Sequence, residues 1–132
     1  MRQFMSFAGL IALMSSSTAL AQAPLRPDQV AFRELYKELV ETNTSYSGKG
    51  CTKAASQLDA RLKAAGFSAA ESQVVVAPDH PDEGSLVVNW AGSAKAMKPM
   101  LLLGHIDVVE ARREDWTRDP YTLIEEEGYF FA

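Results

Sequence analysis

The feature that most constrains the fold is an unbroken apolar run at residues 99–105, PMLLLGH. A strand that is apolar on both faces has to be covered on both sides, as the central strands of α/β proteins are. His105 and Asp107 close this run and share one face of the extended chain, whereas Ile106 points to the other. We therefore expect a central strand that brings an imidazole and a carboxylate to the edge of a sheet, where ligands bind in open α/β folds.

Two helices are predicted before this strand. Apolar residues recur at Phe32, Leu35, Tyr36 and Leu39, the spacing of one helix face, and Pro27 and Asp28 favour a helix start just before them. A second helix is expected at about residues 49–65, with Gly66 ending it in the left-handed conformation. The link between them, residues 43–48, is predicted to be a loop to which we assign no chemistry.

Extended structure is predicted for the rest of the chain. Residues 72–77 and 85–90 are rich in β-branched and aromatic side chains and are expected to be strands, separated by a loop rich in proline, aspartate and glycine. Residues 121–131 are predicted to form a hairpin that turns near Glu127 and Gly128. The fold class is therefore α/β, with two N-terminal helices followed by a mixed sheet and a C-terminal hairpin. Because the chain ends on an aromatic strand without a polar tail, we expect it to be incomplete.

Residues 1–21 have the pattern of a signal peptide. Arg2 precedes an apolar stretch, and Ala19-Leu20-Ala21 fits the small-residue cleavage pattern. A second such triplet ends at Ala23, but Pro24 would then follow the cut. The alternative is a buried N-terminal helix, since the apolar run is too short to span a bilayer. The signal-peptide interpretation predicts a mature chain of residues 22–132 that is exported to the periplasm or secreted.

Charge and cysteine content narrow the choice of partners. The net charge is −4, which argues against binding to nucleic acid or to an anionic membrane surface. A small molecule or a peptide is the expected partner. Cys51 is the only cysteine, so no disulfide can form within the chain. We interpret it as a small, half-buried helix residue rather than a reactive thiol.

The pair His105 and Asp107 can be interpreted in two ways. The histidine can be a metal ligand and the aspartate the group that orients it, with Gly104 leaving room for an ion or a substrate. Alternatively, the histidine is satisfied by hydrogen bonds at the sheet edge and the aspartate begins a loop. The sequence contains no serine-hydrolase elbow, no phosphate-binding glycine loop and no CxxC pair.

A longer pattern around this pair favours the metal site. Residues 101–132 resemble the first metal motif of the co-catalytic zinc hydrolases, which include aminoacylases, acetylornithine deacetylases, succinyl-diaminopimelate desuccinylases and Gly-X carboxypeptidases. The matching residues are an aliphatic strand with His105-Ile106-Asp107-Val108-Val109, then Trp116, Asp119-Pro120-Tyr121 and Glu127-Gly128-Tyr129. The similarity covers roughly residues 28–132.

The resemblance implies an exported zinc-dependent metallopeptidase or amidohydrolase that cleaves peptide or N-acyl amino acid amide bonds with two Zn²⁺ ions. It makes His105 a metal ligand and Asp107 the catalytic acid that holds the site in order. Residues 116 and 119–121 would shape the following loop, and His80 would be a solvated loop residue.

In this family the other ligands, the general base and the lid or dimerisation domain come later in the chain. The resemblance therefore makes residues 22–132 a truncated N-terminal portion of an incomplete zinc-peptidase-like domain, inactive alone and weak in zinc binding. A homodimer is possible for the full-length form. The alternative function is a non-catalytic secreted α/β binding module or a truncated remnant.

Overall fold

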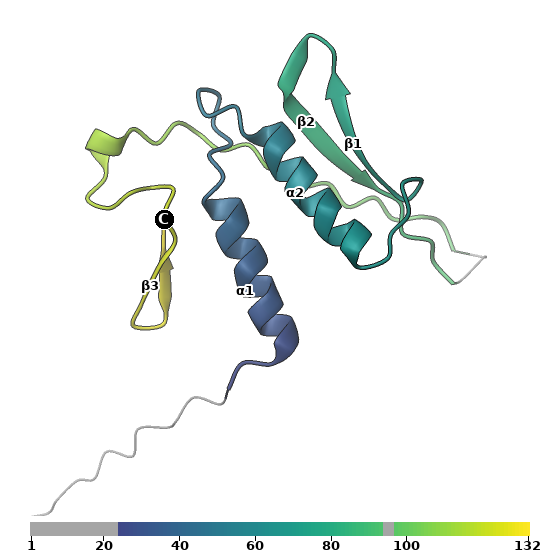
Figure 1. Cartoon of the computed structure of the whole chain (residues 1–132), viewed down its shortest axis with the longest axis horizontal. Helices are drawn as coiled ribbons and strands as arrows, with labels where there is room; N and C mark the ends of the chain where they lie inside the picture. The colour runs from purple at the N-terminus through teal and green to yellow at the C-terminus, as the bar shows by residue number, and fades with distance from the viewer. Residues whose placement is uncertain (1–23, 94–96) are drawn as a thin grey trace, which may run out of the picture.

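The structure, a computed structural model, describes residues 24–93 and 97–132. Two helices come first, α1 (Pro27–Val40) and α2 (Cys51–Ala64). They are followed by an antiparallel pair of strands, a short 3₁₀ helix at Arg113–Asp115 and a C-terminal hairpin (Figure 1). The predicted α/β class is confirmed. The predicted signal peptide, residues 1–21, lies outside the described residues.

Helix α1 begins where the sequence places it. Pro27 occupies the first turn, where its missing N–H costs nothing, and Asp28 adds a negative charge near the positive end of the helix. The side chain of Gln29 accepts a hydrogen bond from the backbone N–H of Arg26 at 2.9 Å. These features stabilise the first turn of the helix, where backbone N–H groups have no partner within the helix.

Helix α2 starts two residues later than predicted. Lys49 has a φ of 54°, in the left-handed region, so the helix can begin only after it. Gly50 is the residue at the N-cap, and its carbonyl accepts the first helical hydrogen bond from Ala54 at 2.8 Å. At the other end Gly66 has a φ of 101°, which confirms its predicted place after the helix.

Strands β1 (Ser72–Ala77) and β2 (His80–Val88) pair as an antiparallel hairpin, with Ser72 opposite Val88 and Ala77 opposite His80. The loop predicted for residues 77–84 is wrong, because the chain already reverses at residues 78–79 and pairs from residue 80 onward. Pro81 is tolerated in β2 because each strand of a two-stranded sheet has an unpaired edge.

Helix α2 covers one face of the β1–β2 hairpin (Figure 1). The hydroxyl of Thr52 donates to the carbonyl of Pro81 at 2.6 Å and accepts from the N–H of Gly84 at 2.7 Å. A Cβ on Gly84 would lie 2.7 Å from that hydroxyl oxygen, so glycine permits the close approach of helix and strand. Ala54 and Ala55 are fully buried in this small interface.

A buried polar contact also joins α2 to β1. Asp59 is buried and accepts hydrogen bonds from Lys63 Nζ at 2.5 Å and from Ser72 Oγ at 2.6 Å. The hydrogen bond from Lys63 and then that from Ser72 lower the pKa of the Asp59 carboxyl below its ordinary value. The ionised carboxylate is thus favoured in the folded chain.

We expect Asp59 to make the fold sensitive to acid. Because its pKa is lower in the folded state, its contribution to stability is complete above the unfolded pKa of about 4 and is lost as the pH falls through the folded value. Urea unfolding of Asp59→Asn at several pH values should show a weaker loss of stability in acid than the wild type. The control is Asp79→Asn at the exposed turn between β1 and β2, and equal acid sensitivity of wild type and Asp59→Asn would contradict the assignment.

Strands β3 (Ile124–Glu126) and β4 (Tyr129–Phe131) form the predicted C-terminal hairpin. Glu127 and Gly128 make its turn with φ values of 51° and 82°, as a two-residue hairpin turn requires. The hairpin packs against α1, where the rings of Tyr36 and Phe130 meet edge to face with centroids 5.6 Å apart. Arg33 of α1 forms an ion pair with Glu125 of β3.

The central strand predicted at residues 99–105 is not formed. Residues 97–112 run as extended chain without strand pairing, and residues 100–103 are 84–93% exposed. A strand requires a neighbour that supplies hydrogen bonds along its length, and within residues 24–93 and 97–132 the strands form only two separate antiparallel pairs. No helix among the described residues is long and apolar enough to cross a membrane.

Candidate metal centre

His105 and Asp107 lie near each other on an exposed segment without strand pairing, not at the predicted edge of a sheet. The imidazole Nδ1 of His105 is 3.4 Å from a carboxylate oxygen of Asp107 and 3.0 Å from the backbone carbonyl oxygen of the same residue. The two side chains are 86% and 73% exposed. Ile106 between them is half-buried.

The contacts of Nδ1 determine which ring nitrogen is available to a ligand. Both neighbours of Nδ1 are oxygen acceptors, so in the neutral imidazole Nδ1 carries the hydrogen and Nε2 keeps its lone pair. An imidazole held in this tautomer by a carboxylate can coordinate a metal through Nε2. The side chain is exposed enough for an ion to reach that nitrogen.

The loop between α1 and α2 contacts this segment, which the sequence did not predict. Thr44 donates its hydroxyl hydrogen to the carbonyl of Ile106 at 2.7 Å, and Ser47 binds the carboxylate of Glu110. Figure 1 shows the loop beside the chain that follows residue 97. The sequence feature that could have indicated a structured loop is the group of hydroxyl residues before Gly48 and Gly50 in NTSYSGKG.

Cys51, the first residue of α2, lies near the same segment. Its thiol contacts the carbonyl of Thr44 at 3.6 Å and is half-buried, which confirms its predicted burial. Burial first, and then the negative charges of Asp107 and Glu83, raise the pKa of the Cys51 thiol. Both effects disfavour the thiolate form of Cys51.

Comparison with known proteins gives three partial matches. Aminoacylase-1 of Mus musculus is 30% identical over 108 residues, which are 80% of this chain. Probable carboxypeptidase S-like 2 and probable carboxypeptidase S-like 1 of Dictyostelium discoideum are 51% identical over 49 residues and 39% identical over 46 residues. These partial matches are consistent with a fragment of the family of aminoacylases and carboxypeptidase S-like proteins. No family model matches the sequence, and no solved structure matches the chain significantly.

The matches to the aminoacylase family are uneven in extent. The matched stretch spans 24% of the length of aminoacylase-1, and 9–10% of the two carboxypeptidase S-like proteins. In this chain, the two shorter matches cover 35% and 36% of the residues. The chain thus spans about a quarter of the length of aminoacylase-1.

The other residues of the family motif form the turns that follow the candidate site. Asp119 accepts a hydrogen bond from the N–H of Tyr121 at 2.9 Å, and Pro120 is buried. The carbonyl of Trp116 accepts a hydrogen bond from Arg113 at 2.6 Å. These contacts support their predicted role in shaping the loop. His80 is exposed as predicted, but it begins β2 rather than lying in a loop.

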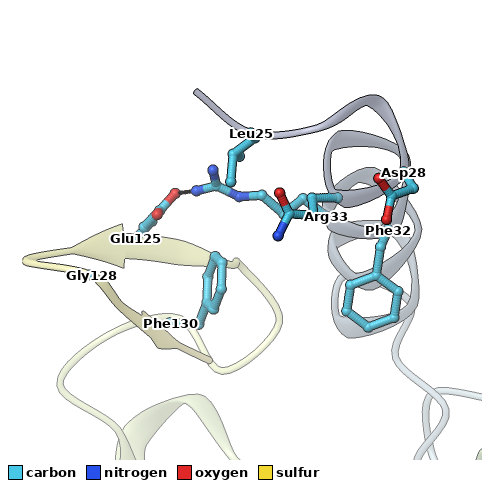
Figure 2. A pocket seen from close by; sticks show the side chains of 8 residues that line it. Leu25, Asp28, Phe32, Arg33, Glu125, Gly128 and Phe130 are labelled. Atoms are coloured by element: carbon cyan, nitrogen blue, oxygen red, sulfur yellow. Dashed lines mark ion pairs between the residues drawn. The ribbon is translucent and has the colours of Figure 1, made fainter. Parts of the chain in front are cut away.

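An open cavity lies elsewhere among the described residues. It has a volume of about 620 Å³ and opens between α1 and the β3–β4 hairpin (Figure 2). Phe32, Arg33, Glu125 and Phe130 line it, and Figure 2 shows Arg33 reaching across to Glu125. His105 and Asp107 are outside this cavity, whereas Gly128 of the motif lines it.

His105 and Asp107 meet some of the requirements of a zinc site. Zn²⁺ is bound by imidazole nitrogen and by carboxylate oxygen, and its histidine ligands donate their second ring N–H to an acceptor. His105 with Asp107 meets both conditions. A catalytic zinc ion needs three protein ligands. Among the described residues no three His, Cys, Asp or Glu side chains gather to hold an ion.

Proposed function

We propose that this chain is part of an exported zinc-dependent hydrolase that cleaves peptide or N-acyl amino acid amide bonds. The names of its relatives, aminoacylase and carboxypeptidase, describe hydrolases of this type. The single observation that carries the proposal is the position of Asp107 beside Nδ1 of His105 in the sequence HIDVV. The substrate class proposed is a short peptide or an N-acyl amino acid.

The chemistry of the chain's own residues follows from this geometry. The hydrogen bond between Nδ1 of His105 and the backbone carbonyl of Asp107 favours the tautomer that leaves Nε2 free to bind the metal, and the negative charge of the nearby carboxylate makes that nitrogen a stronger donor. Zinc, when bound, supplies polarisation of the scissile carbonyl and a more acidic water. Asp107 is thus an orienting group, because its carboxylate lies beside the ligand rather than in its place.

The proposal includes export, metal content and partners. Residues 1–21 carry the signal-peptide pattern that supports a periplasmic or secreted location. The net charge of −4 supports a small substrate over nucleic acid. Two Zn²⁺ ions and a homodimer are proposed for the complete protein. Residues 1–132 alone are proposed to be inactive, because the described residues supply one ligand and one orienting acid.

A second candidate function is a non-catalytic binding module. It is favoured by the exposed apolar side chains of residues 100–103, which lie on extended chain that could pair with a strand of a partner. The two candidates differ in what they require of His105. A zinc hydrolase needs the imidazole of His105 to bind the metal. Strand pairing uses backbone hydrogen bonds and does not need this side chain.

The proposed function predicts that activity depends on zinc. The protein isolated from its source should hydrolyse N-acetyl amino acids or dipeptides, lose this activity with a chelator and regain it with added Zn²⁺. Residues 1–132 produced alone should show no hydrolysis even with added zinc. Amide hydrolysis that survives complete removal of zinc from the isolated protein would contradict the proposal, and hydrolysis by residues 1–132 alone would contradict their inactivity.

A further inference from the structure

The loop that joins α1 to α2, residues 43–50, is tightly built from small polar residues. The side chain of Asn43 accepts hydrogen bonds from the N–H and the hydroxyl of Ser45, at 3.0 and 2.7 Å. Ser45 is almost fully buried, and its hydroxyl accepts a hydrogen bond from the N–H of Gly48 at 3.2 Å. A Cβ on Gly48 would lie 2.6 Å from the backbone oxygen of Asn43. The loop is therefore a defined structure rather than a loose connection.

The first contact of this loop reaches the peptide between the two site residues. Thr44 is only 5% exposed, and its hydroxyl donates to the carbonyl of Ile106 at 2.7 Å across 62 positions of sequence. That carbonyl belongs to the peptide unit that joins Ile106 to Asp107, so the contact limits rotation directly beside the aspartate. The carbonyl of Thr44 itself contacts the thiol of Cys51, which fixes the threonine to the start of α2.

The second contact holds the same segment at Glu110, four residues after Ile106. The backbone N–H and the hydroxyl of Ser47 donate to the two carboxylate oxygens of Glu110, at 2.8 and 2.7 Å. These hydrogen bonds from Ser47 hold the pKa of Glu110 below its ordinary value, so the acceptor stays ionised at neutral pH. Hydrogen bonds to a carboxylate are stronger than those between neutral groups.

We infer that the loop at residues 43–50 holds the His105–Glu110 segment in place, and that Thr44 and Ser47 are positioning residues for the metal site. Both residues donate hydrogen bonds to this segment, Thr44 to the carbonyl of Ile106 and Ser47 to the carboxylate of Glu110. The segment is otherwise extended and exposed. This inference deepens the proposed function and rests on it for the metal, but the contact itself can be tested without metal.

The test uses a buried hydroxyl just before this loop as its control. Thr42 is also 5% exposed, and it donates to the carbonyl of Glu38 at 2.8 Å, away from the site. In the full chain, Thr44→Val is expected to lower the NMR order parameter of the Asp107 amide from about 0.85 toward 0.6, and Thr42→Val to leave it unchanged. Thr44→Ser keeps the hydroxyl and should restore the wild-type value.

Zinc affinity gives the second readout. Competition with a chromophoric chelator should show affinity about tenfold lower for Thr44→Val and for Ser47→Ala than for the wild type, with Thr42→Val and Thr44→Ser close to it. Ser47 is exposed, so its variant tests the inference even where Thr44→Val fails to fold. An Asp107 order parameter that is unchanged in both Thr44→Val and Ser47→Ala overturns the inference. Zinc binding that does not depend on His105 overturns the proposed function, and the order parameters still decide whether the loop holds the segment.

Discussion

Replacing His105 by alanine is expected to lower the zinc affinity of the protein produced by its source by about 100-fold or more. The substitution removes the imidazole that the proposed function assigns to the metal. Residues that only orient a ligand already change metal affinity by roughly 10–100-fold when they are replaced, so loss of the ligand itself should reach at least the upper end. The rate of amide hydrolysis should fall together with the zinc content. Zinc content by mass spectrometry and the rate of amide hydrolysis measure both effects.

His80 provides a matched control for this experiment. Its Nδ1 lies 3.4 Å from a carboxylate oxygen of Glu83, the same separation as between His105 and Asp107, and its side chain is 61% exposed. His80→Ala therefore removes a similar imidazole–carboxylate pair outside the family motif and should leave zinc and activity unchanged. Asp107→Asn should give an intermediate loss of about 10–100-fold in affinity, because the ligand remains but its orienting charge is gone. If His105→Ala and His80→Ala bind zinc equally well, the binding-module alternative gains support.

The helices and the C-terminal hairpin could be predicted because their signals are local. The apolar spacing of Phe32, Leu35, Tyr36 and Leu39 predicts α1, and Gly66 marks the end of α2 through its own backbone conformation. The turn at residues 127–128 likewise depends on residues that are neighbours in sequence. Each of these elements is specified within about one helical turn or one hairpin.

The central strand and the loop contacts depend instead on residues far apart in sequence. An apolar run indicates that a strand would be covered, but not which strand pairs with it, and no strand among residues 24–93 and 97–132 pairs with residues 99–105. The early start of β2 likewise depends on its pairing with β1. His105 and Asp107 were found because their relation is local, whereas Thr44 and Ser47 reach the segment across 62 and 63 positions.

The tight loop gives the second large prediction, that Gly50→Ala destabilises the chain by roughly 3 kcal/mol, the upper part of the range for overpacked sites. A Cβ at this position would lie 2.2 Å from the backbone oxygen of Asn43 and 2.8 Å from its carbonyl carbon. Both atoms belong to the backbone, so no side-chain rotation can relieve the overlap, and the loop or the start of α2 has to move. Gly50 is also the N-cap residue of α2, a position where alanine is less favourable than glycine, so loss of the cap adds to the effect of the overlap.

Urea unfolding of the wild type, Gly50→Ala and Gly104→Ala separates the overlap from the general effect of adding a methyl group. An ideal Cβ on Gly104 has no other described atom within 4 Å, so its variant should stay within about 0.5 kcal/mol of the wild type. Gly50→Ala should have a lower midpoint with a similar slope, which indicates lost stability rather than a changed unfolded state. Because Asn43 also anchors Ser45, the same variant should loosen the loop that holds residues 105–110. Equal midpoints for the two variants would mean that Gly50 is not held against Asn43 in solution.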